Sequence, residues 1–95
     1  MTTDQFKTSL QADAPPAGIS LALQAMWYDA NGDWDKAHSA AQDQDDRTGA
    51  WVHAYLHRVE GDEFNAGYWY RRANKPHSQA TLAEEWDEIV DALCE

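Results

Sequence analysis

Two glycine–aspartate corners restrict the folds open to this chain more than any other feature of its sequence. Gly32-Asp33 and Gly61-Asp62 lie 29 residues apart, and each stands between two stretches in which apolar residues recur at helical spacing. Glycine commonly ends a helix in the left-handed conformation, and aspartate caps the N-terminus of the helix that follows. The two corners therefore predict two helical hairpins of similar length.

The apolar residues on both sides of these corners repeat every three or four positions, as on one face of a helix. The predicted buried stripes are Ile19, Ala22, Leu23, Met26, Trp27 and Ala30; Trp34, Ala37 and Ala41; Val52, Tyr55, Leu56 and Val59; Ala66, Trp69, Tyr70 and Ala73; and Leu82, Trp86, Ile89, Val90 and Leu93. No stretch alternates with a period of two, so we expect no sheet. The predicted fold is all-α, made of antiparallel helical hairpins with about five helices.

The length of 95 residues is enough for one domain. Pro15, Pro16 and Gly18 interrupt any helix that begins near the N-terminus, although Asp4 to Gln11 has the spacing of a short one. The predicted units are an N-terminal arm (1–18) and a single helical domain (19–95) that contains one hairpin (19–43), a second hairpin (47–74) and a C-terminal helix (79–94).

The corner at Gly32-Asp-Trp-Asp-Lys-Ala37 resembles the turn in the middle of a tetratricopeptide repeat. The other matching residues are Ala25 and Ala54 in the first helices, Ala66, Tyr70 and Ala73 in the second helix, and Pro76 at the end. The resemblance covers about residues 19–76 as two repeats, with a period of 29 rather than 34 residues. It implies a tetratricopeptide-like architecture. The stretch from His53 to Ala73 also resembles a group of small proteins with no assigned activity, which implies no mechanism.

Charge restricts the partners that this chain can bind. Its 17 acidic and 7 basic residues give a formal net charge of −10. Such a surface repels phosphate backbones and anionic lipids, so we expect neither a nucleic-acid nor a membrane partner. The chain has a single cysteine, Cys94, no apolar run long enough to span a bilayer, and no signal-peptide pattern in its first ten residues. These features predict a cytoplasmic protein.

Basic and acidic residues are segregated near the C-terminus. The segment 64–77 contains three bases and no acid, whereas 79–95 contains six acids and no base. We interpret the acids as the solvated face of the last helix, because charge runs on amphipathic helices usually face water. Thr81 followed by Glu84 has the pattern of a capping box and predicts where this helix begins.

A basic-aromatic segment is the leading candidate for a binding site. Its residues are Phe64, Tyr68, Arg71, Arg72 and Lys75. Phe64 and Tyr68 lie opposite the buried stripe of their helix, and tyrosine and arginine are typical interface anchors. The leading hypothesis is an interaction module that binds a protein partner, or a second copy of the chain, through this face. In the alternative, the arm or the last helix covers both aromatics, and the arginines pair with Glu84, Glu85 or Asp87.

A histidine pair supports a second hypothesis, a metal- or small-ligand-binding protein that includes the possibility of a hydrolase. His53 and His57 are four residues apart on one helix, and Glu60 follows three residues later. Such a pair chelates divalent metals, and Glu60 or Asp62 would complete three ligands. Ala54 stands where the metalloprotease motif needs its glutamate. The simpler interpretation is two histidines at a helix boundary that face water or bond to a neighbouring helix.

Other catalytic patterns are missing from the sequence. It has no glycine-rich phosphate loop, no nucleophile elbow and no serine or cysteine beside a base. We therefore expect no catalytic residue and no cofactor, and we favour a binding function over an enzymatic one. We interpret His38 as a histidine at the edge of the core and His77 as an exposed loop residue. The acids around Cys94, near the end of the sequence, should raise the pKa of its thiol and keep it unreactive. A third hypothesis, an acidic mimic of nucleic acid, ranks last because the bases at 71–75 interrupt the acidic face.

Overall fold

The computed structural model describes residues 1–94, and this part of the chain contains six α-helices and no strand. The helices are α1 (Thr3–Ser9), α2 (Leu21–Ala30), α3 (Trp34–Asp43), α4 (Arg47–Val59), α5 (Glu63–Ala73) and α6 (Leu82–Leu93). The all-α prediction is confirmed, but the count of about five helices is too low by one. None of these six helices has the length and apolar composition needed to cross a bilayer.

The sixth helix lies in the N-terminal arm. The Thr2 and Gln5 side chains form a reciprocal capping box that starts α1. Phe6, in the middle of α1, is fully buried and belongs to the same apolar core as the later helices. Lys7 forms an ion pair with Asp87 of α6 at 3.2 Å. The arm therefore packs against the helical domain and contributes to its core.

The two predicted corners adopt the same turn. Gly32 and Gly61 have φ angles of 80° and 82°, in the left-handed region that favours glycine. Asp33 and Asp62 each cap the next helix by accepting a hydrogen bond at 3.1 Å from the backbone nitrogen three residues later. The turns join α2 to α3 and α4 to α5, which are the two most extensively packed helix pairs.

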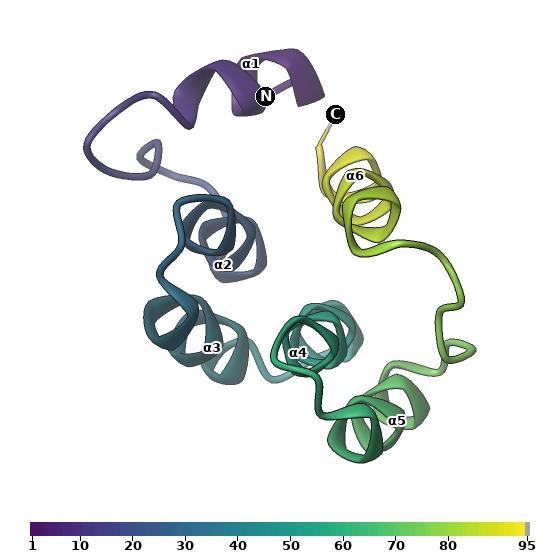
Figure 1. Ribbon diagram of the computed structural model, residues 1–95. Coiled ribbons are helices and arrows are strands. Elements are labelled where there is room, and N and C mark those ends of the chain that lie inside the picture. Colours follow the sequence, from purple (N-terminus) through teal and green to yellow (C-terminus); the bar gives the residue numbers. More distant parts are fainter. Residues whose placement is uncertain (95) are drawn as a thin grey trace.

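Helix α4 lies at the centre of the molecule, with α2, α3, α5 and α6 around it (Figure 1). Its predicted stripe is confirmed at Val52, Tyr55 and Leu56, which are almost completely buried, whereas Val59 is only partly buried. Because neighbours surround α4, burial extends beyond the stripe to residues on its other faces, among them His53 and His57.

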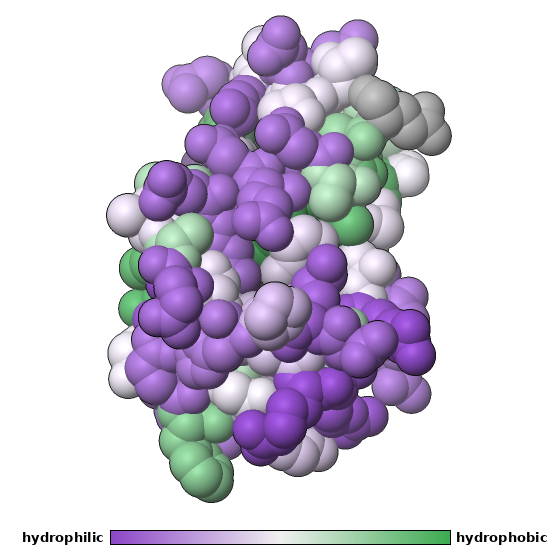
Figure 2. All heavy atoms as spheres, turned by 90° about the vertical axis from the view of Figure 1, so that its right-hand side faces the viewer, coloured by the Kyte–Doolittle hydropathy of each residue, from purple (hydrophilic) through white to green (hydrophobic). Residues whose placement is uncertain are grey.

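The acidic face of α6 is only partly solvated. Figure 2 shows that the side carrying α6 is mostly hydrophilic, with hydrophobic side chains in small separate patches. Glu85, however, is 1% exposed and accepts hydrogen bonds from Arg58 and Tyr70, each at 2.6 Å, and from Trp51 at 3.2 Å. The prediction of a solvated Glu85 is wrong, because this position lies one turn before Ile89 on the buried side of the helix.

Candidate functional site

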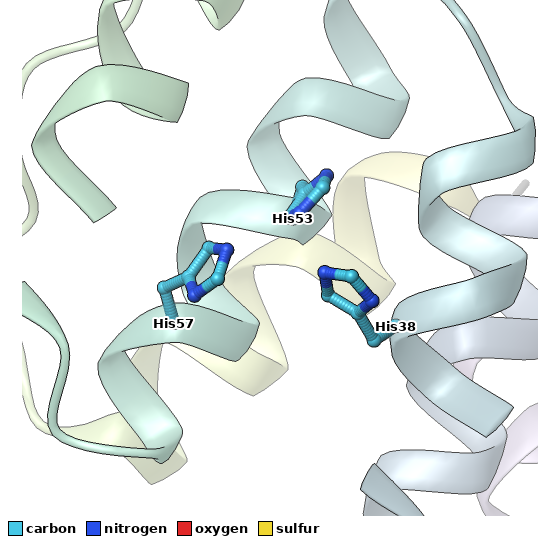
Figure 3. Close-up of side chains that lie close together, drawn as sticks. All are labelled: His38, His53 and His57. Carbon is cyan, nitrogen blue, oxygen red and sulfur yellow. The ribbon is translucent and has the colours of Figure 1, made fainter. Parts of the chain in front are cut away.

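Three imidazole rings lie together between α3 and α4 (Figure 3). His38 comes from α3, and His53 and His57 come from consecutive turns of α4. One potential ligand nitrogen of each ring lies within 4.8 Å of those of the other two. The ring centroids are 4.5 Å apart for His38 and His53, and 4.9 Å apart for His53 and His57. We call these three residues the histidine trio.

The trio is largely shielded from solvent. His53 is 4% exposed and His57 is 8% exposed, whereas His38 is half-buried. The indole of Trp69 on α5 stacks on the His53 ring at 3.8 Å, and the indole of Trp34 stacks on His38 at 4.8 Å. The interpretation of His53 and His57 as boundary histidines that face water is wrong, because α3 and α5 cover this side of α4.

Burial keeps two of the rings uncharged. Burial, together with the neighbouring His38, His57 and Arg72, lowers the pKa of His53 to about 4. The pKa of His38 is lowered by its own burial and then by the nearby His57. At neutral pH, His53 and His38 therefore carry a free nitrogen lone pair each, which is the form that binds metal ions. Among the described residues, neither ring forms a hydrogen bond with the protein.

Glu60 orients the third ring. Its Oε1 lies 2.7 Å from Nδ1 of His57. A carboxylate accepts hydrogen bonds, so this contact places a ring proton on Nδ1 and makes Nε2 the nitrogen that could bind a metal. A carboxylate that bonds to the remote nitrogen of a metal-binding histidine is a common outer support of metal sites. Glu60, predicted as a direct ligand, therefore fits better as a supporting residue.

A second group of potential ligand atoms consists of His57, Glu60 and Asp62, again within 4.8 Å of one another. Its members have other contacts. Asp62 caps α5, and its two carboxylate oxygens accept hydrogen bonds from the backbone and the side-chain amide of Asn65 at 3.1 and 2.6 Å. Burial and free lone pairs both favour the histidine trio over this more exposed group.

A close approach of α3 and α4 brings His38 to the pair on α4. The short connection between the helices, residues 44–46, folds back over Gly49 in the first turns of α4. A Cβ atom at Gly49 would collide with the backbone carbonyl oxygen of Gln44. The side chain of Asp46 accepts a hydrogen bond from the Gly49 backbone nitrogen at 2.8 Å and starts α4 at this point. Glycine at position 49 is therefore required for the spacing that completes the trio.

Sequence reasoning identified His53 and His57 as a pair but missed the role of His38. His38 lies 15 residues before His53 and on another helix, so no local spacing connects it to the pair. The available signal was Gly49, because a glycine inside a helical pattern often has a packing reason.

The predicted basic-aromatic face is only partly assembled. Phe64 is 85% exposed and Tyr68 is 43% exposed, and the guanidinium of Arg72 lies 5.9 Å from the Tyr68 ring centre. These three residues form a row along the outside of α5, which we call the α5 row. Lys75 lies elsewhere, 4.1 Å from the ring centre of Trp51. The alternative in which other segments cover Phe64 and Tyr68 is wrong.

Comparison with known proteins identifies no relative of this chain. No protein family, no curated protein and no solved structure matches it. A function can therefore be inferred only from the geometry of the histidine trio and the α5 row.

Proposed function

We propose that this protein binds a divalent transition metal ion, with Zn²⁺ as the best fit, through His38, His53 and His57. The observation that carries the proposal is the convergence of three imidazoles from two helices, with their ligand nitrogens within 4.8 Å of one another. Imidazole is a preferred ligand for Zn²⁺, Cu²⁺ and Ni²⁺ but not for Mg²⁺ or Ca²⁺. Small side-chain rotations would bring the three nitrogens to the roughly 2 Å bonds that zinc forms with histidine.

The surroundings of the trio match those of metal sites. Two rings are uncharged at neutral pH, so little proton displacement is needed on binding. Glu60 holds the third ring by its remote nitrogen. Three histidines also leave a fourth position of a tetrahedral metal open to water or another ligand, which is the arrangement of catalytic rather than structural zinc sites.

A titration of the metal-free protein with Zn²⁺ tests this proposal and separates the two ligand sets. We expect one Zn²⁺ per chain. His38→Asn should abolish tight binding because it removes a ligand. Glu60→Gln should weaken binding by about 10–100-fold, as is typical of outer supporting residues. His77→Asn is the matched control, because His77 lies outside the trio and contacts Glu63.

If Glu60 were a ligand and His38 were not, Glu60→Gln would cause the larger loss and His38→Asn would bind as the wild type does. That result would replace the trio by the set predicted from the sequence. A wild-type protein that shows no saturable zinc binding at micromolar concentration would refute both sets.

We propose a second function, protein–protein interaction through the α5 row, on the strength of one observation: the 85% exposure of Phe64. An exposed aromatic pair next to an arginine is typical of interface anchors. The partner that the chain's own charges favour is a second copy, whose exposed acids on α6 would face Arg72. Salt should weaken such a contact, because exposed charges are screened.

Sedimentation analysis over a range of protein concentrations tests this second function. We expect a dimer that dissociates in the double variant Phe64→Ala with Tyr68→Ala, while helicity is unchanged. Leu82→Ala is the matched control, since Leu82 is 38% exposed on α6. A wild-type chain that stays monomeric at all concentrations would contradict it.

We propose, finally, that the pairs α2–α3 and α4–α5 are antiparallel hairpins of a tetratricopeptide-like arrangement. The matching turns at Gly32 and Gly61, and the fully buried alanines Ala37 and Ala66 that follow each by five residues, support this arrangement.

A cytoplasmic location is likewise a proposal, which cell fractionation would test.

A further inference from the structure

A pocket of about 290 Å³ adjoins the histidine trio. His53 lies in its wall, beside Trp69 and Arg72 of α5. The rest of the lining comes from the end of α3, the connection to α4 and Arg47 in the first turn of α4. His53 therefore belongs both to the trio and to the pocket, so a molecule in the pocket would lie next to a bound metal. The volume suits a small ligand rather than a drug-sized one.

Two arginines from different helices line this pocket. Arg47 and Arg72 are 25 positions apart in the sequence, and among the described residues neither forms an ion pair. Arg72 also lies 5.0 Å from the ring centre of Trp69, which in turn stacks on His53. The stack positions Arg72 beside the trio while leaving its guanidinium without a carboxylate partner. Arginine binds carboxylates and phosphates with paired hydrogen bonds.

Two aspartates also line the pocket, and one of them already accepts hydrogen bonds within the protein. Asp46 accepts hydrogen bonds from the Gly49 backbone at 2.8 Å and from the Gln44 side-chain amide at 3.2 Å. Asp46 keeps its charge, so the lining holds two arginines and two aspartates. Among the described residues neither aspartate forms an ion pair with Arg47 or Arg72, so both arginines can still bind the oxygens of a ligand.

We infer that this pocket binds a small oxyanion, a carboxylate or phosphate group, between Arg47 and Arg72 with one oxygen directed to the open position of the metal. The inference rests on the proposed metal site and names the ligand class of that site. A carboxylate or phosphate oxygen is a suitable fourth ligand for Zn²⁺. The arginines would supply the charge-assisted hydrogen bonds that select an anion over water.

Cobalt-loaded protein offers a direct test, because the visible absorption of Co²⁺ changes when its coordination changes. A cobalt titration of each variant comes first and shows whether the trio still binds metal. The Co²⁺ protein is then titrated with acetate in one arm and with methylphosphonate in the other, which separates the two oxyanion sources. The variants are Arg47→Gln and Arg72→Gln, with Arg71→Gln as the matched control, since Arg71 is exposed on α5 but does not line the pocket.

We expect a saturable spectral change in the wild type with at least one of the two anions. Each pocket variant should bind that anion about tenfold more weakly or worse, the loss typical of one charge-assisted hydrogen bond, while Arg71→Gln should bind as the wild type does. Cobalt binding without an anion response, or an equal response in all variants, would overturn the inference and leave the metal site standing. Failure to bind cobalt would remove the metal site and the inference together.

Discussion

Acid should destabilise the metal-free protein through the buried His53. In the unfolded chain, a histidine binds a proton below pH 6.5. In the folded protein, burial and the neighbouring His38, His57 and Arg72 lower the pKa of His53 to about 4. Between these two values the unfolded state binds more protons than the folded state. The free energy of unfolding must therefore fall as the pH is lowered through this window.

The size of the effect follows from the two pKa values. A fully expressed difference between 6.5 and about 4 corresponds to about 3 kcal/mol. At pH 4.5, where the folded ring is still mostly neutral, about 2 kcal/mol of this should already be lost. A small domain is typically stable by only about 5–15 kcal/mol, so a loss of this size is easily measured.

Urea unfolding at pH 7 and at pH 4.5, followed by far-UV circular dichroism, measures the loss. His53→Phe is the control, because a phenyl ring keeps the stack on Trp69 and cannot titrate. The acids titrate in both proteins, so the difference between the two pH-induced losses isolates His53. We expect the wild type to lose about 2 kcal/mol more than the variant. Equal losses in the two proteins would show that His53 is not held neutral, and would contradict its place in a buried trio.

Three further substitutions test other parts of the structure by urea unfolding. Replacing glycine by alanine stabilises most helices, but Gly49→Ala should destabilise this protein by about 1–3 kcal/mol, because the added methyl group meets the Gln44 carbonyl. A stabilised variant would contradict the close approach of α3 and α4. Glu85→Ala should cost about 3–5 kcal/mol, since it leaves the guanidinium of Arg58 without its buried partner; a loss below 1 kcal/mol would mean that water replaces the carboxylate. Phe6→Ala should cost about 3–5 kcal/mol, whereas an arm that only rests on the surface would lose almost nothing.

Local signals in the sequence predicted most of the helical pattern. Glycine allows the positive φ angles at Gly32 and Gly61. The caps Asp33, Asp62 and Thr81 each accept a hydrogen bond from the backbone nitrogen three residues later. Such features depend on neighbours in the chain, so reading the sequence is enough to find them. The predicted pair of His53 and His57 on one face of α4 has the same origin, because helical periodicity alone brings them together.

The features that sequence reasoning missed depend on contacts between distant segments. His38 joins the trio only because α3 packs on α4, and Glu85 is buried only because Arg58 and Tyr70 reach it from two other helices. Helical periodicity cannot distinguish an acid on the solvated face from one that meets a buried arginine. The contribution of α1 to the core was missed for a similar reason. Phe6 becomes a core residue by packing against the remote Trp86, with 6.1 Å between the ring centres.

The position of the trio suggests why a domain with only two helix pairs would benefit from a metal ion. His38 belongs to the first pair, α2–α3, and His53 and His57 belong to the second, α4–α5. In the tetratricopeptide-like arrangement that we propose, two units would be fewer than the three or more that stacked helical repeats usually need, because each unit buries its apolar face only against its neighbours. A metal held by both pairs would stabilise the folded state by RT ln(1 + [metal]/Kd), or about 2.7 kcal/mol at a concentration 100-fold above Kd. The three histidines lie apart in the unfolded chain, so the metal would bind the folded state alone. Its stabilising contacts would lie between the two pairs, where α3 and α4 meet.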